Sequence, residues 1–457
     1  MAELTEHNTL HAYLQQAPDT RFVELLVADM NGILRGKRAP VDEVAKLFGS
    51  GANFCAATLV LDSKGATFDQ VVYGGEDGDP DLRARAVAGT LAPVPWGRLP
   101  MAQAMVELSQ FNGQPYFLDS RQVLRRALKP LTEMGLHPVM AVELEFYLVA
   151  HDGVDFHPRM PRIPGSNLPQ DGLNYALLDD LLEVDDFLAD VDAFCRLQNI
   201  PAGATLAEFA PGQFEVNLHH VDDPLRACEH GLLLKRAIKA AASKNGMAAT
   251  FMAKPFAGIP GSGLHIHVSL LDDNGQNVFA GSCADGPFSD TLRHAIGGLG
   301  EVMAESMAIF APNANSYRRY VRGSFVPCTP NWGINHRGVA MRIPLSSPAN
   351  SRVEMRVAGA DANPYLVTAA VLAGLHHGIS GRCEPGPMVR ESQVIEEVIT
   401  FPVSWPQALD AFAAGRILPT YLGEEFCRVF AVCRREEASR FRSEITNRDY
   451  QWYLRAV

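Results

Sequence analysis

The residues with the clearest chemical potential form an alternating segment, Gly261-Ser262-Gly263-Leu264-His265-Ile266-His267-Val268-Ser269-Leu270. A glycine turn leads into a predicted strand whose polar face carries His265, His267 and Ser269. Two imidazoles and a hydroxyl on one face of a half-buried strand are a concentration of reactive groups. Solvated histidines on an ordinary strand would give the same pattern, so the rest of the chain must decide between the two interpretations.

Carboxylates recur in three further segments. Glu143 and Glu145 stand two residues apart in an apolar run, so a strand would place them on one face, roughly 6–7 Å apart. Like charges there are costly unless a cation lies beside them, although an exposed edge strand is the alternative explanation. Glu208 and Glu215 flank a Pro-Gly turn, and Glu354 lies between two arginines. Five glutamates and one histidine suit Mg²⁺ or Mn²⁺ better than zinc.

Arginines are concentrated in the C-terminal half of the chain, as Arg318, Arg319, Arg322, Arg337, Arg342, Arg352 and Arg356. Guanidinium groups bind carboxylates and phosphates bidentately, and a structural salt-bridge network is the alternative. Together with metal-binding carboxylates, they predict a nucleotide-phosphate site for phosphoryl transfer. The absence of a GxxxxGK[ST] segment excludes a P-loop enzyme.

The bulk composition is that of an ordinary globular protein. The 457 residues, 47% hydrophobic and 20% charged, suffice for two or three domains. A net charge of −12 argues against nucleic acid as a partner. Eight cysteines without a CxxC pair, no basic-then-apolar leader and no long apolar run predict a cytoplasmic protein without a membrane span.

The elements that must position these residues can be read from periodicity and turn residues. A hairpin is predicted around Asn31-Gly32. Helices are predicted over residues 119–134, 185–198 and 223–246, and in the stretch 361–381 after Asn363-Pro364. Strands are predicted over residues 139–150, 248–254, 264–270, 338–343 and 352–357.

Several motifs, in order along nearly the whole chain, resemble those of the glutamine synthetase family. They are Glu143-Leu144-Glu145-Phe146, Pro211-Gly212-Gln213-Phe214-Glu215, Lys254-Pro255, Gly261 to Ser269, Asn315-Ser316-Tyr317-Arg318-Arg319, Arg337 to Pro344, Arg352 to Arg356 and Ala362-Asn363-Pro364-Tyr365. Segments such as Ala28-Asp29-Met30-Asn31-Gly32 and Val357 to Leu366 are most similar to the family's γ-glutamylputrescine synthetase branch.

The resemblance implies an α+β fold with two domains. A β-grasp domain would span residues 18–107, and a catalytic domain with a curved antiparallel sheet and helices would span 112–457. The family also implies a homo-oligomer, a dodecamer of two stacked hexamers with shared active sites. ATP and L-glutamate would be substrates, and two or more Mg²⁺ or Mn²⁺ ions would be cofactors.

The resemblance further implies a role for each site residue. Each of two cations would have three ligands, Glu145, Glu208 and Glu215 for one and Glu143, His265 and Glu354 for the other. The residues facing ATP would be His267, Ser269 and Arg352. Glutamate would contact Gly261, Arg319 and Arg356. The transferring phosphoryl group would be stabilised by Arg337 and Arg342.

The chain departs from glutamine synthetases on the amine side. Phe325 replaces the flap glutamate in Val321-Arg322-Gly323-Ser324-Phe325, Cys55 aligns with the aspartate that binds ammonium, and Pro260 replaces an asparagine. Apolar walls favour a longer amine, because each buried methylene contributes ~0.8 kcal/mol. We therefore predict ATP-dependent γ-glutamylation of a polyamine (putrescine, cadaverine or spermidine) in polyamine catabolism, through a γ-glutamyl phosphate.

The remaining predictions concern the base, regulation and the alternatives. Glu208 and the region of Tyr175 are candidates to accept the amine proton. No Asn-Leu-Tyr-Asp-Leu-Pro segment occurs between Gly381 and Pro402, which predicts no control by adenylylation. The alternatives are a ligase for ethanolamine, an alkylamine or an aromatic amine, a true glutamine synthetase, and an inactive scaffold.

Overall fold

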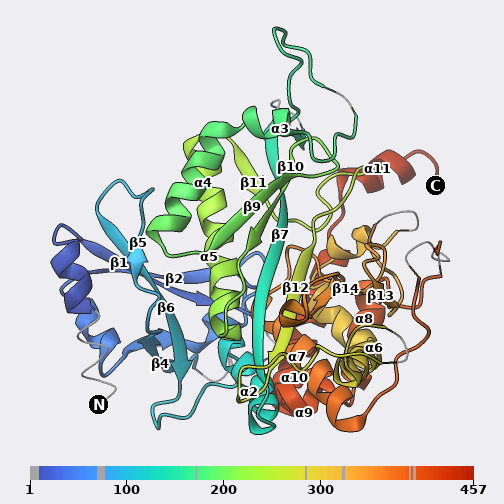
Figure 1. The fold of residues 1–457 in the computed structure, drawn as a ribbon. Helices are drawn as coiled ribbons and strands as arrows, with labels where there is room; N and C mark the ends of the chain where they lie inside the picture. Colours follow the sequence, from blue (N-terminus) through green and yellow to red (C-terminus); the bar gives the residue numbers. More distant parts are fainter. Residues whose placement is uncertain are drawn as a thin grey trace.

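The computed structural model describes residues 10–68, 71, 78–151, 153, 155–170, 172–283, 286–321, 325–390, 393–394 and 398–457. Arg322, Gly323 and Ser324 of the predicted flap therefore lie outside the described residues. Within these ranges the chain forms two β-sheets with helices around the second, which confirms the predicted α+β class (Figure 1).

The first sheet has the strand order β2-β1-β6-β4-β3, with β5 paired to β6. Its strands are β1 (Phe22–Ala28), β2 (Leu34–Pro40), β3 (Ala52–Cys55), β4 (Asp81–Ala86), β5 (Ala92–Pro93) and β6 (Met101–Ser109). β1 and β2 form the predicted antiparallel hairpin. Gly32 in its turn has φ +74°, and a Cβ there would lie 2.9 Å from Cα of Asn363, so glycine is needed at this position.

The second sheet has the strand order β13-β14-β15-β12-β7-β10-β9, and β8 and β11 also pair with β7. Its strands are β7 (His137–His151), β8 (Phe156–Pro158), β9 (Ala202–Ala207), β10 (Gln213–Leu218), β11 (Ala248–Thr250), β12 (Leu264–Leu271), β13 (Trp332–Ile334), β14 (Met341–Ile343) and β15 (Val353–Met355). Because β7 lies between β12 and β10, the edge-strand explanation for Glu143 and Glu145 is wrong.

The main helices are α2 (Ser120–Glu133), α3 (Leu178–Leu182), α4 (Asp185–Leu197), α5 (Pro224–Lys244), α6 (Asp290–Phe310), α7 (Pro364–Gly381), α8 (Trp405–Ala414), α9 (Leu418–Leu422), α10 (Glu424–Ser443) and α11 (Asn447–Tyr453). Among the helices of the described residues, α2, α5, α6, α7 and α11 begin with a side-chain cap. The side chain of Asn363 accepts a hydrogen bond from the backbone N–H of Tyr365. This cap, with Pro364 in the first turn, starts α7 at the Asn363-Pro364 pair that marks the predicted helix, three residues after the first residue of the predicted range.

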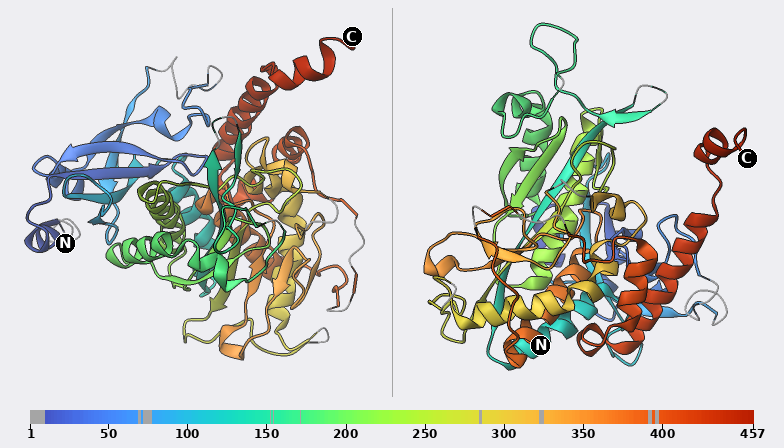
Figure 2. Two further views of the ribbon diagram at one scale, coloured as in Figure 1. Left: turned by 90° about the horizontal axis from the view of Figure 1, so that it is seen from above. Right: turned by 90° about the vertical axis from the view of Figure 1, so that its right-hand side faces the viewer.

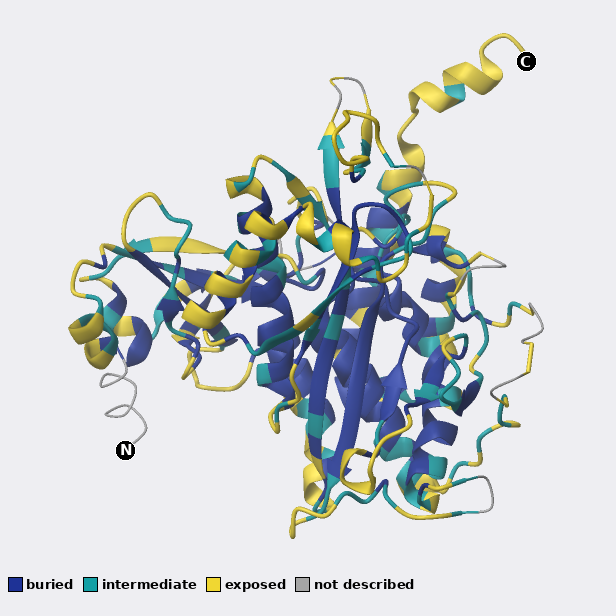
Figure 3. Ribbon diagram, turned by 45° about the horizontal axis from the view of Figure 1, so that its top comes forward, coloured by how far each residue is buried: buried dark blue, intermediate teal, exposed yellow. Residues whose placement is uncertain are grey.

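The strands of the second sheet have one apolar and one polar face. Leu144, Ile266 and Val268 are fully buried, and α5 packs against β7 and β11. Figure 3 shows these central strands as the most deeply buried part of the sheet. The opposite face of the same strands carries the charged residues considered below.

The C-terminal helix α11 extends away from the rest of the molecule (Figure 2). Trp452, Tyr453 and Leu454 at its end are exposed, by 51% to 70% of their surface. No helix in the described part of the chain combines the length and apolar character that a membrane crossing requires.

Candidate active site

The strand register brings the predicted site residues into adjacent rows. His267 on β12 lies opposite Glu354 on β15, and His265 lies opposite Glu143 on β7. On the far side of β7, Glu145 lies opposite Glu215 of β10. Directly opposite residues in a sheet have Cβ atoms about 4.5–5.5 Å apart. The polar faces of the strands therefore form one continuous site.

One group of ligating atoms surrounds Glu143. Its Oε1 lies 2.6 Å from Nδ1 of His265, and its Oε2 lies 3.2 Å from Nε2 of His267. Ligand atoms of Glu143, His267 and Glu354 all lie within 4.8 Å of one another. Nδ1 of His265 is 3.9 Å from Oε1 of Glu354. The structure thus brings both histidines to this group, whereas the family resemblance assigns only His265 to it.

A second group consists of Glu145, Glu208 and Glu215, whose oxygens also lie within 4.8 Å of one another. Glu145 accepts a hydrogen bond of 2.6 Å from the backbone N–H of Gly263. Glu215 accepts one of 2.8 Å from Nδ2 of Asn217. The three carboxylates predicted to hold one cation are therefore together.

The protonation of these carboxylates follows from their surroundings. Burial and the charge of Glu145 raise the pKa of Glu208 to about 7. Burial and the neighbouring carboxylates, Glu143 first, also raise the pKa of Glu215. At Glu143 the effect of burial is outweighed by His265 and His267, which hold its pKa well below the ordinary value. A divalent cation would offset the repulsion, and these oxygen and imidazole donors fit Mg²⁺ or Mn²⁺.

Two of the predicted arginines, Arg342 and Arg356, contact Glu354. Nη1 of Arg342 lies 2.6 Å from Oε2 of Glu354, and Arg356 is hydrogen-bonded to Oε1 of the same carboxylate. Nε of Arg352 donates to Nδ1 of His267 at 3.3 Å. Arg337 is exposed. Its positive charge lowers the pKa of Glu208, but the opposite effect of burial on that pKa is larger. The sequence leaves open whether these arginines bind phosphate or form structural salt bridges. Salt bridges between arginines and Glu354 are present within the site.

The glycine turn before β12 lies against Arg319. A Cβ at Gly263 would lie 2.7 Å from Nη2 of Arg319 and 2.8 Å from Nε2 of His265, and a Cβ at Gly261 would lie 2.3 Å from the carbonyl oxygen of Ala253. Arg319 is buried and donates to the carbonyl oxygen of Val357 at 2.8 Å. Both glycines are required for this close approach.

Ser269 is an uncharged residue of the site, and its side chain is bonded to the backbone of a neighbouring segment. Its hydroxyl is buried and donates to the carbonyl oxygen of Ser351 at 2.9 Å. This bond ties β12 to the segment before β15.

Three stacked aromatic rings lie next to the second carboxylate group. The ring centroids of Tyr175 and Phe209 are 4.5 Å apart, and those of Phe209 and Phe325 are 5.1 Å apart. Tyr175 and Phe325 are 41% and 63% exposed. Cys55, in contrast, lies on the first sheet, where its Sγ contacts Asp79 at 3.0 Å.

Two residues of this site are not among those that the sequence predicts. Phe209 directly follows Glu208, but no spacing rule predicts that its ring would join Tyr175 and Phe325. Asn217 stands two residues after Glu215 on the same strand, so the period of two could have placed both on one face.

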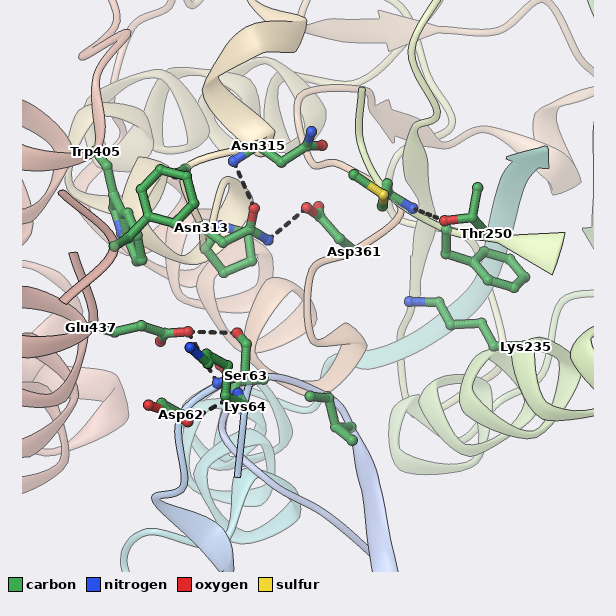
Figure 4. A pocket seen from close by; sticks show the side chains of 18 of the residues that line it. Asp62, Ser63, Lys64, Lys235, Thr250, Asn313, Asn315, Asp361, Trp405 and Glu437 are labelled. Carbon is green, nitrogen blue, oxygen red and sulfur yellow. Dashed lines mark hydrogen bonds between the residues drawn. The ribbon is translucent and has the colours of Figure 1, made fainter. Parts of the chain in front are cut away.

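A separate cavity of about 1130 Å³ is lined by the turn between β1 and β2, by α5 and β11, and by the C-terminal helices α8 and α10 (Figure 4). Ser63 on one side donates to Glu437 at 2.5 Å, and Asn313 on another donates to Asp361 at 2.8 Å. Of the arginines considered above, Arg318 lines this cavity, and none of the residues to which the resemblance assigns a role does. The chemistry described above belongs to the open polar face of the second sheet.

Comparison with known proteins decides the family. The sequence model described as "Glutamine synthetase, catalytic domain" matches residues 117–453. The chain belongs to the glutamine synthetase family. Membership confirms the predicted enzyme class, an ATP-dependent glutamate–amine ligase.

Relatives of this family member differ in the amine they are named for. Over 97% of the chain it is 40% identical to the γ-glutamylputrescine synthetase PuuA of Escherichia coli (strain K12), of which 93% is covered. It is 31% identical to the γ-glutamylethanolamide synthetase GlnA4 of Streptomyces coelicolor, with 98% of the chain and 94% of that protein covered. It is 30% identical to a glutamate–isopropylamine ligase from a Pseudomonas species, with 94% of each covered.

Solved structures confirm the fold of this family member. The GmaS/ADP complex has a TM-score of 0.82 and 25% sequence identity, with 97% of this chain and 99% of that one covered. GmaS without ligand has a TM-score of 0.81 and 26% identity over the same shares.

Proposed function

We propose that this ligase joins the γ-carboxyl group of L-glutamate to one amino group of a polyamine such as putrescine, cadaverine or spermidine, and that it serves polyamine catabolism. The observation that carries the choice of amine is the stack of Tyr175, Phe209 and Phe325 beside the carboxylate group. The likeness to a γ-glutamylputrescine synthetase supports the same choice.

The first half of the reaction requires a cationic site. Glu145, Glu208 and Glu215 would hold one Mg²⁺ or Mn²⁺ ion, and Glu143 and Glu354 with His265 and His267 would hold a second. Bound cations would neutralise the triphosphate and polarise the transferred group. His267, Ser269 and Arg352 form the proposed ATP side.

Activation of glutamate converts a poor leaving group into a good one. Gly261, Arg319 and Arg356 would orient glutamate so that its γ-carboxylate attacks the terminal phosphate of ATP. The products are ADP and γ-glutamyl phosphate. Arg337 and Arg342 would stabilise the charge on the transferring phosphoryl group.

The second half of the reaction requires a neutral amine. Glu208, next to Phe209, is the proposed acceptor of the amine's proton, with Tyr175 beside it. The neutral nitrogen then attacks the acyl phosphate, phosphate leaves, and an amide forms. A diamine keeps a second ammonium group, which an aromatic face attracts by roughly 0.5–2 kcal/mol.

A steady-state panel tests this proposal. ADP release is measured with ATP, Mg²⁺ and glutamate and with putrescine, cadaverine, spermidine, ethanolamine, isopropylamine or ammonium. We expect kcat/KM for the best di- or polyamine to exceed that for every other amine by about tenfold or more, a difference of about 1.4 kcal/mol.

Each other outcome of the panel selects an alternative. Comparable kcat/KM for ammonium would indicate a true glutamine synthetase. Preference for ethanolamine or isopropylamine would indicate a ligase for a monoamine. ADP release that no amine stimulates would indicate an inactive scaffold.

We also propose that the chain acts in the cytoplasm as a dodecamer of two stacked hexamers. The exposed aromatic end of α11 supports self-association, because such surface is normally covered by a partner.

A further inference from the structure

Three metal-ligating side chains of different types converge outside the active site. Glu301 lies on α6, His377 lies near the end of α7, and Cys383 follows α7 by two residues. One ligand atom of each, an oxygen, a nitrogen and a sulfur, lies within 4.8 Å of the other two. Nε2 of His377 is 2.9 Å from Oε2 of Glu301.

Glycines explain why the two helices approach closely enough for this convergence. A Cβ at Gly298 of α6 would lie 2.3 Å from the backbone N of Gly378 on α7. A Cβ at Gly297 would lie 2.4 Å from the carbonyl oxygen of Cys383. Glu301 lies one helical turn after these glycines on α6. Side chains at the glycine positions would therefore push α7 and the turn that follows it away from Glu301.

The turn after α7 holds Cys383 in place. Arg382 has φ +51°, the left-handed conformation that ends many helices. The backbone N–H of Cys383 donates to the carbonyl oxygen of Gly378 at 3.0 Å, and Nδ1 of His294 lies 3.2 Å from the carbonyl oxygen of Cys383. The ligand group is therefore organised without help from an ion, which lowers the cost of binding one.

The donor set distinguishes this group from the active site. Thiolate, imidazole and carboxylate together suit a borderline ion such as Zn²⁺, which takes four ligands in a tetrahedron. The active-site carboxylates suit harder cations. The side chains of Glu301 and His377 are 50% and 31% exposed, so water can reach the fourth position.

We propose that Glu301, His377 and Cys383 bind one Zn²⁺ ion, with water as the fourth ligand, and that the ion joins α6 to the end of α7. On binding, the S–H bond of Cys383 breaks, an S–Zn bond forms, and the proton passes to solvent. No group is oxidised or reduced. A simple hydrogen bond between His377 and Glu301 beside an unrelated thiol would bind no ion.

Cobalt(II) is the probe, because a thiolate ligand produces near-ultraviolet charge-transfer absorption that carboxylates do not. The full-length, metal-stripped protein is titrated with Co²⁺ in excess Mg²⁺, which competes for the active-site carboxylates. We expect one thiolate-bound Co²⁺ per chain, displaced by one equivalent of Zn²⁺. Absence of the charge-transfer band in the unmodified protein would overturn the proposal.

Matched variants assign the band to these residues. C383S should abolish it, and C283S, at another partly buried cysteine, should leave it unchanged. H377A should weaken Co²⁺ binding by more than the roughly 10–100-fold that loss of an outer partner costs. Persistence of the band in C383S would contradict the assignment.

Thermal unfolding provides a readout that depends on neither cobalt nor activity. In excess Mg²⁺, Zn²⁺ should raise the melting temperature of the unmodified protein and of C283S. It should not raise that of C383S or of E301Q, in which glutamine keeps a partner for His377. Equal zinc-induced shifts in all four proteins would overturn the proposal.

Discussion

Glu143 and Glu208 are two partly buried carboxylates with opposite electrostatic surroundings. Both oxygens of Glu143 face imidazoles, at 2.6 Å and 3.2 Å, and these neighbours keep its pKa low in spite of burial. Glu208 has mainly carboxylate neighbours, and burial together with Glu145 raises its pKa to about 7. At the residue scale, the second carboxylate group therefore has the excess negative charge that a bound cation would neutralise.

A substitution at Phe209 tests whether the aromatic stack binds the amine, also at the residue scale. F209L keeps an apolar side chain but removes the ring between Tyr175 and Phe325. We expect KM for a diamine to rise about 2–30-fold, which corresponds to loss of a cation–π contact, with KM for ATP and glutamate nearly unchanged. Initial-rate kinetics with each substrate varied in turn measure the three constants.

A control variant separates the stack from general effects of losing a ring. Phe156 on β8 is 68% exposed, and F156L should leave all three KM values unchanged. A uniform rise of all three in F209L would show that the ring supports the site as a whole and does not select the amine.

At the scale of elements, the glycine turn and β12 connect the two halves of the site. β12 pairs with β15 on one side and with β7 on the other, so its histidines reach carboxylates of both strands. The turn before it packs against Arg319 and donates the backbone N–H of Gly263 to Glu145. A small displacement of this turn would therefore disturb the metal ligands and the proposed glutamate site together.

G263A tests this coupling. The added methyl group would lie 2.7 Å from Arg319 and 2.8 Å from His265, so both side chains must move. We expect the Mg²⁺ concentration for half-activation and KM for glutamate to rise together, each by about tenfold or more. G386A is the control, because a Cβ there meets nothing within 4 Å. A change in only one of the two constants would contradict coupling through the turn.

At the scale of the whole molecule, the carboxylates link metal binding to stability. The pKa of Glu208 is about 7 in the folded protein against an ordinary value of 4.5. Its proton thus stabilises the metal-free fold below about pH 4.5, and this contribution is lost as the pH rises through about 7. Metal ions need the ionised carboxylate, so they gain affinity over the same range.

We therefore expect Mn²⁺ to stabilise the protein more at about pH 8 than at about pH 6. The difference in the free energy of unfolding should be on the order of 1–3 kcal/mol. Thermal or urea unfolding with and without Mn²⁺ at both pH values measures it. E208Q should reduce the difference, and a metal-induced gain that is the same at both pH values would contradict the prediction.

Much of the fold and site could be predicted because strand periodicity is local. The alternation of apolar and polar residues along a strand predicts that Glu143 and Glu145 share one polar face, and that His265 and His267 share another. The start of α7 could also be predicted, because Asn363-Pro364 is a recognisable cap, although the range 361–381 begins three residues before the helix. Phe209 could not be predicted, since its contacts come from segments distant in the sequence.

The sequence by itself determined which residues share a face, which ions their donors suit and which family the motifs resemble. These properties follow from side-chain chemistry and from the two-residue period of a strand. Only the tertiary structure decided that Glu143 meets both histidines, that three rings stack beside Glu208, and that Glu301, His377 and Cys383 converge. The physical reason is that strand register and helix crossing depend on packing between distant segments, which no local pattern encodes.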